Sequence, residues 1–144
     1  MPPLTLEQLN EACTPFIGDI MQVPPMVSAI KKDGVPLYKL ARKGVEVERE
    51  ARLVHIYNFR FTSYAEPLGQ FRLACTKGTY VRTLAHDLGQ KLGCGAHLAA
   101  LRRTATEKFH VSQALTLDQI QALTLPEIEK RLIAPRDAVP SIAL

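Results

Sequence analysis

One stretch of this 144-residue chain gathers the side chains best suited to chemistry. Residues 75–103 read CTKGTYVRTLAHDLGQKLGCGAHLAALRR, a pattern that predicts a strand end, a tight turn, a helix, a glycine-rich loop and a short helix. Tyr80 and Arg82 stand where the turn meets the helix. A tyrosine at such a junction is most often a packing residue with a satisfied hydroxyl, but its phenol is also able to move a proton. The guanidinium of Arg82 suits a carboxylate, because its planar fork offers two parallel hydrogen bonds.

The turn is predicted from the residues just before the helix. Gly78 is able to adopt a positive φ at the bend, and Thr79 is placed to cap a helix that begins near Tyr80. Arg82 then falls in the first helical turn, where the helix dipole favours an anion rather than a cation. This local conflict indicates that Arg82 serves something outside its own helix.

A second block lies upstream, where residues 18–44 read GDIMQVPPMVSAIKKDGVPLYKLARKG. Together the two blocks resemble the TruB-family tRNA pseudouridine synthases. In that family K-G-T-Y-[IV]-R, D-L-G, L-G-x-G-A-H and L-R-R-[TL] occur in this order, after a segment of the form G-x-I-x-Q-x-P-P-x-[YF]-S-A. The resemblance runs from about residue 6 to residue 109, with a weaker match beyond. Val27 departs from it, because the family usually has an aromatic residue there.

The resemblance implies an α+β protein with a partial pseudouridine-synthase fold, a mixed and mostly antiparallel sheet flanked by helices. It implies an isomerase that converts the T-loop uridine of tRNA to pseudouridine without a cofactor. An aspartate acts on the glycosidic linkage, the uracil rotates, and a carbon–carbon bond forms. The tyrosine that matches Tyr80 lies against the flipped uracil and is a candidate for handling its C5 proton. Arg82 matches the arginine that pairs with the catalytic carboxylate. Leu101 matches an apolar residue of the pocket wall, a role compatible with a plain core position.

Basic residues near both blocks are the candidates for RNA contacts. From residue 77 to residue 103 five cations stand against one acid, which suits a polyanion, although charge alone favours a solvated face. Lys77 is explained as well by a phosphate contact as by a solvated strand end. The resemblance suggests that at least one of the adjacent Arg102 and Arg103 contacts RNA or the pocket wall. It also suggests T-stem contacts for the cations that follow the proline loop. Taken singly, each of those cations is more typical of a solvent-facing position. The candidate set is Lys77, Arg102, Arg103, Lys31, Lys32 and Arg42.

The family's aspartate motif has no counterpart in the sequence. Relatives carry the catalytic aspartate in a G-x-L-D-x-x-A-x-G segment, and none of the aspartates here lies in that context. Asp33 belongs to a KKDG turn, and Asp87 lies inside a predicted helix. We therefore expect residues 1–144 to be the C-terminal portion of the catalytic domain, without the N-terminal half that carries the aspartate and without a PUA domain. Such a chain is expected to be inactive alone and to need that half as a partner.

The bulk composition predicts a single compact unit. Of the residues 47% are hydrophobic and 22% charged, and the formal net charge is +4. Three cysteines without a pairing pattern fit a cytoplasmic protein, and no apolar run approaches membrane-spanning length. The first expected elements are a helix from residue 6 capped by Thr5, an ordered loop over 14–29 and a turn over 31–35. A helix over 37–43 ended by Gly44 follows, and then one bent strand or two strands over 45–61, paired with 70–75. Further helices are expected after Thr116 and from Pro126.

Other chemistries find little support. Cys94 and His97 are within reach of one metal ion, but no second pair stands at ligand spacing. Two rival interpretations remain, an RNA-binding module without catalysis and a structural half-domain that self-associates through an exposed sheet edge. RNA binding without product favours the first, and a mass that rises with concentration reveals the second.

Overall fold

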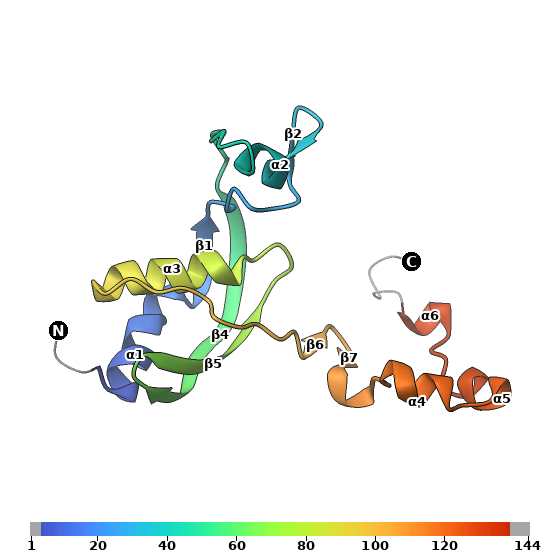
Figure 1. Ribbon diagram of the computed structural model, residues 1–144. Helices are drawn as coiled ribbons and strands as arrows, with labels where there is room; N and C mark the ends of the chain where they lie inside the picture. The colour runs from blue at the N-terminus through green and yellow to red at the C-terminus, as the bar shows by residue number, and fades with distance from the viewer. Residues whose placement is uncertain (1–3, 139–144) are drawn as a thin grey trace. The chain divides into compact units, whose positions relative to one another are not determined.

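The computed structural model describes residues 4–138, which form two compact units with their boundary between Ala100 and Leu101 (Figure 1). The expectation of a single unit was therefore wrong. Composition averages over the whole chain, whereas every buried apolar side chain of residues 4–138 lies between Leu9 and Leu88. The first unit has the hydrophobic core, and the residues from 101 to 138 form a smaller unit of short elements.

The first unit is built on an antiparallel sheet of three strands in the order β1-β4-β5. The strands are β1 (Gly18–Gln22), β4 (Arg52–Ala65) and β5 (Leu68–Cys75). In β4 the apolar residues alternate toward one face at Val54 and Ile56. An extra residue, Tyr57, interrupts the pairing there, so Phe59 returns to the buried face. Of the two alternatives expected within residues 45–61, the structure has the single strand, β4, although it begins later and runs further.

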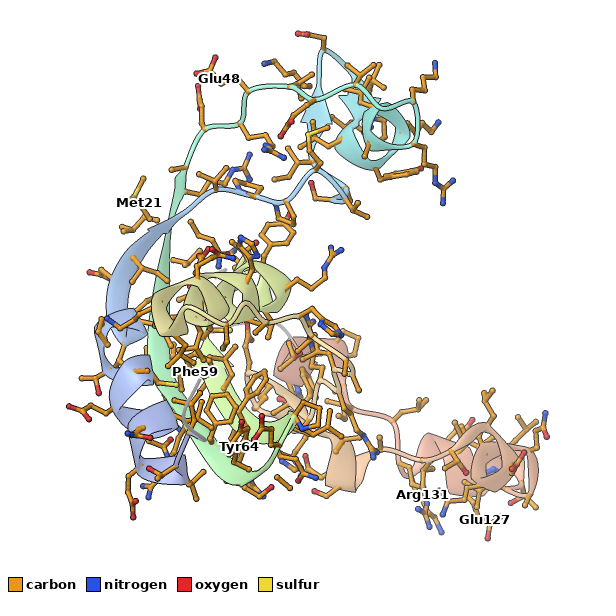
Figure 2. The ribbon with its side chains drawn as sticks, turned by 60° about the vertical axis from the view of Figure 1, so that its left-hand side comes forward. Met21, Glu48, Phe59, Tyr64, Glu127 and Arg131 are labelled. Carbon is orange, nitrogen blue, oxygen red and sulfur yellow. The ribbon has the colours of Figure 1, made fainter. Side chains whose placement is uncertain are left out.

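Two helices, α1 (Leu6–Cys13) and α3 (Val81–Leu92), cover one face of this sheet (Figure 1). Their buried residues meet those of β4 in one cluster, whose members are Cys13, Ile56, Phe59, Leu84 and Leu88. The opposite face is open: Figure 2 shows Met21 pointing out from β1, and its side chain is 63% exposed. The sheet is therefore buried on the side that carries the two helices, and α3 is fixed by its apolar stripe.

The segment between β1 and β4 forms a hairpin and a short helix. Its elements are β2 (Lys31–Lys32), β3 (Val35–Pro36) and α2 (Leu37–Ala41). Asp33 and Gly34 turn the hairpin with φ of 50° and 79°. Leu37 is buried, and its amide donates to the carbonyl of Ile30 at 2.7 Å. The expected turn is confirmed, and α2 is two residues shorter than the predicted helix.

The second unit contains two short strands, one 3-10 turn and three short helices among the residues that the structure describes. They are β6 (Ala105–Thr106), β7 (Phe109–His110), a 3-10 turn η2 (Val111–Gln113), α4 (Leu117–Gln121), α5 (Leu125–Glu129) and α6 (Pro135–Ala138). Thr116 caps α4 with the expected reciprocal pattern, in which Gln119 bonds back to the threonine amide. Local capping therefore sets this helix start, as Thr5 sets the start of α1.

Two expected elements differ from the structure. Residues 14–29 are not all loop, because they contain a 3-10 turn η1 (Thr14–Phe16) and strand β1. Pro15 lies at the first positions of η1, where its missing amide costs nothing, and Pro24 lies beyond the end of β1. The short helix expected near the end of residues 75–103 is absent from the described chain, where residues 94–104 are irregular. Among residues 4–138 no helix has the length and apolarity needed to cross a bilayer.

Gly89 shows why the D-L-G segment of α3 needs glycine. Its carbonyl accepts from the amide of Gly95 at 3.0 Å, and a Cβ at Gly89 would meet the backbone of Gly95 and Ala96. We expect Gly89→Ala to destabilise the chain by about 3 kcal/mol, because overpacking against backbone outweighs the better helix propensity of alanine. Urea denaturation measures the change. Gln90→Ala, at an exposed position of the same helix, is the control and should shift stability by less than about 0.5 kcal/mol. Equal midpoints for the two variants would contradict the close approach.

The Cys13 thiol gives a pH prediction for the same core. Its side chain is fully buried, and burial raises its pKa from 9.0 to about 11. The unfolded thiol then ionises at lower pH than the folded one, so its contribution to stability is intact below pH 9 and is lost as the pH rises toward 11. The advantage of the unsubstituted chain over Cys13→Ala should shrink across this window by about 2 kcal/mol in denaturation experiments. Cys94→Ala, at an exposed site, should show no such change.

Candidate functional site

The turn between β5 and α3 is held to the sheet by hydrogen bonds from Thr76. Its amide donates to the carbonyl of His55 at 2.9 Å, and the His55 amide donates to the Thr76 hydroxyl at 2.9 Å. Gly78 takes the expected positive φ, 87°. Thr79 does not cap the helix as predicted, because its hydroxyl donates to the Thr76 carbonyl at 2.9 Å and so closes the turn. The N-cap of α3 is Tyr80, without a side-chain cap of its own.

The backbone of Tyr80 is bound by a side chain from β1. Gln22 is 3% exposed, and its Oε1 accepts from the Tyr80 amide at 2.7 Å. Its Nε2 donates to the Tyr80 carbonyl at 3.1 Å. The tyrosine side chain is partly buried at the start of α3. The side-chain amide of Gln22 thus binds both the backbone amide and the backbone carbonyl of Tyr80, which is 58 positions away in the sequence.

Arg82 is exposed in the first turn of α3, and its Nη2 donates to the carbonyl of Val27 at 2.6 Å. This contact agrees with the expectation that Arg82 serves something outside its own helix. Among residues 4–138 a carboxylate lies within 4 Å of a basic nitrogen between Arg49 and Glu46 and between His55 and Asp19, so Arg82 has no carboxylate partner within the described chain. The Arg82 guanidinium carries five N–H groups, so it retains donors that the hydrogen bond to Val27 does not use.

The other predicted residues divide between the two units. Leu101, Arg102 and Arg103 open the second unit, and all three are exposed. The side chain of Leu101 is 63% exposed, so the structure does not show it in a packed core. Tyr80, Arg82 and Lys77 lie together in the first unit.

The four predicted cations of the first unit have different surroundings. Lys31 and Lys77 are exposed. The Nζ of Lys32 donates to the carbonyl of Glu48 at 3.0 Å, on the segment labelled in Figure 2. The guanidinium of Arg42 lies 5.5 Å from the centre of the Tyr38 ring, a cation–π geometry. Two of these cations therefore stabilise the hairpin segment locally, and two are open to a partner.

Three polar residues of this region were absent from the predicted set. Gln22 is part of the quoted upstream block, but its partner could not be identified from spacing along the chain. Arg52 pairs with Gln22 in the register of β1 and β4, which places an exposed cation beside it. Arg49 is partly buried, bonds to Glu46 at 3.3 Å, and its Nε has no hydrogen-bond partner within the described chain. No group of three or more metal-ligating side chains occurs among residues 4–138.

Known proteins match this chain over nearly all of its length. The model of the "TruB family pseudouridylate synthase (N terminal domain)" matches residues 1–81, and that of the "tRNA pseudouridylate synthase B C-terminal domain" matches residues 82–139. The chain belongs to the TruB family of pseudouridylate synthases. The matches do not confirm that all of it is the C-terminal half of a catalytic domain, since they include the N-terminal model. Tyr80 and Arg82 fall on either side of the boundary between the two models.

The curated relatives carry the name tRNA pseudouridine synthase B. The protein of Opitutus terrae is 65% identical over 142 residues, which are 99% of this chain and 59% of the relative. That of Pseudomonas aeruginosa is 51% identical over 135 residues, and that of Geobacter sulfurreducens 46% identical over 134 residues. Each of these two alignments takes in 92% of this chain and 44% of the relative. The chain therefore spans about half the length of the relatives it matches.

The Arg82–Val27 contact can be tested without any substrate. Next to Val27, the buried Ser28 donates its amide to the Met26 carbonyl at 3.0 Å. We expect Arg82→Gln to speed hydrogen exchange at the Ser28 amide about three- to tenfold, because the loop loses a charged donor. Global stability should change by less than about 0.5 kcal/mol, since the arginine is exposed. Amide exchange followed by NMR measures the first and urea denaturation the second. Arg103→Gln is the control, and equal exchange rates in both variants would show that the contact does not hold the loop.

Proposed function

We propose that this chain is part of a tRNA pseudouridine synthase that isomerises the uridine of the T loop. Its support is the turn over residues 76–80, which fixes Tyr80 at the N-cap of α3 with Arg82 in the first turn of that helix. Membership of the TruB family supports the same reaction class. Because the substrate is tRNA, the proposed place of action is the cytoplasm, and the proposed reaction needs no cofactor.

In this proposal Tyr80 and Arg82 have separate tasks. Tyr80 lies against the flipped uracil and handles the C5 proton, which has to leave after the base is reattached through carbon. Arg82 keeps the catalytic carboxylate ionised and oriented. It can do so while one Nη2 hydrogen bonds to Val27, since the remaining N–H groups still present a fork to a carboxylate. Leu101 contributes to the pocket wall.

The carboxylate that acts on the glycosidic bond is proposed to come from outside these 144 residues. Asp19 is bonded to the His55 ring at 2.6 Å, and Asp33 turns the β2–β3 hairpin with a φ of 50°. Asp87 is exposed on α3. None of these three has a side-chain hydrogen bond or salt bridge to Tyr80 or Arg82 within residues 4–138. This chain is therefore proposed to be the C-terminal portion of a catalytic domain and to be inactive alone.

The T arm of tRNA is the proposed partner of the basic residues. Lys31 and Lys77 are exposed cations of the first unit, and Arg102 and Arg103 are exposed cations of the second. Lys32 and Arg42 already have partners within the hairpin segment, so in this proposal they shape it and add charge. Binding should weaken steeply with salt, because each phosphate contact releases condensed counterions.

The deciding experiment measures pseudouridine in a T-arm RNA hairpin. It uses the chain alone and the chain mixed with the N-terminal half of the Opitutus terrae relative. We expect product only in the mixture, and we expect Tyr80→Phe to abolish it while Tyr57→Phe, at an exposed sheet position, leaves it unchanged. Product from the chain alone would overturn the proposal of an external carboxylate.

Two other outcomes would favour the rival functions. Salt-dependent RNA binding without product in every mixture would favour a non-catalytic binding module. A mass that rises with concentration in sedimentation would reveal self-association, for which β1 and β5 offer the edges of the sheet in the first unit.

A further inference from the structure

The start of α3 is held from outside the helix. An N-cap residue usually supplies a side-chain oxygen to the free amides of the first turn, but Tyr80 has no such bond, and Thr79 is committed to closing the preceding turn. The Tyr80 carbonyl accepts the first helical bond from the Leu84 amide at 3.1 Å. The same carbonyl and the Tyr80 amide are the two groups that Gln22 binds. The Tyr80 backbone is therefore tied to α3 on one side and to β1 on the other.

Gln22 is suited to hold a residue in a fixed place. It is the last residue of β1, and its backbone position is set by antiparallel pairing with Arg52 of the central strand. Its side chain is buried, and an amide is able to donate and accept at once, which neither a carboxylate nor an ammonium group can do. The loss of this amide would leave both a donor and an acceptor of the peptide backbone without a partner.

We infer that Gln22 is a positioning residue for Tyr80, setting the place of the tyrosine ring relative to the reacting uracil. This inference rests on the proposed function. The loop that follows Gln22 also contains Val27, whose carbonyl accepts a hydrogen bond from Arg82. The end of β1 and the loop that follows it thus contact both Tyr80 and Arg82, the residues proposed to act on the base and the carboxylate. In this proposal Gln22 itself touches neither the uracil nor the catalytic carboxylate, because both of its side-chain hydrogen bonds go to the backbone of Tyr80.

The test compares three variants in the complemented assay. Gln22→Met keeps the length of the side chain but loses both bonds, and Gln22→Glu keeps the acceptor. Gln90→Met, at an exposed position of α3, is the matched control. We expect Gln22→Met to lower the turnover rate about 10- to 100-fold, because small misplacement of a reacting group is costly, with T-arm RNA affinity within about twofold of the unsubstituted protein. Gln90→Met should retain both the turnover rate and the T-arm RNA affinity of the unsubstituted protein.

The Gln22→Glu variant adds a pH readout. A protonated carboxyl both accepts from the Tyr80 amide and donates to its carbonyl, as the native amide does. An ionised carboxylate keeps the first bond and repels the carbonyl. The activity of Gln22→Glu relative to the unsubstituted protein should therefore rise as the pH falls, whereas the relative activity of Gln22→Met should stay flat.

Hydrogen exchange separates a failure of this inference from a failure of the proposed function. The Tyr80 amide should exchange faster in Gln22→Met than in Gln90→Met, whether or not any mixture makes product. If the unsubstituted mixture is inactive, the proposed function fails and the exchange rate alone decides whether Gln22 holds Tyr80. Unchanged turnover in Gln22→Met would overturn the positioning role. So would parallel losses of turnover, RNA affinity and folded protein, since these indicate a purely structural residue.

Discussion

The packing of α3 against β4 is the interaction on which the candidate site depends. Leu84 and Leu88 bury the apolar stripe of the helix against Ile56 and Phe59 of the central strand, with Cys13 of α1 completing the cluster. This burial is non-directional, so it fixes the helix on the sheet but leaves its exact rotation and end point to other contacts. Tyr80 lies one turn before Leu84, and its position is therefore set jointly by the core and by the polar bonds at the helix start.

Those polar bonds come from parts of the chain that are far apart in sequence. The amide of Gln22 reaches Tyr80 from the end of β1, and the Val27 carbonyl reaches Arg82 from the following loop. Thr76 joins the turn to β4 from the other side. The bonds of Gln22 and Thr76 are partly buried, and buried polar groups are costly when unpaired, so these bonds select one arrangement of the turn rather than adding much net stability. The hydrophobic cluster supplies stability, and the polar contacts set the geometry of the candidate site.

Sequence predicted the features that depend on neighbours along the chain. Thr5 and Thr116 lie at true helix starts, since a capping box is complete within four residues. The sequence did not predict the role of Thr79, because whether its hydroxyl closes the turn or caps the helix depends on how Tyr80 is held. The two-unit organisation was missed for a similar reason, because composition does not record where the apolar residues are buried. The motif made Tyr80 and Arg82 candidates, whereas the hydrogen bonds of Gln22 to Tyr80 became visible only in the fold.

The setting of Arg82 has an electrostatic consequence for the site. A helix start carries partial positive charge from its free amides, and the first turn of α3 holds no acidic residue to balance it. Arg82 adds a full positive charge at the same place, and a neutral carbonyl offsets only part of it. Both sources therefore favour an anion beside Tyr80, and each is fixed in place before the anion arrives. A carboxylate entering this position would meet charge that is already oriented, and that charge would favour its ionised form.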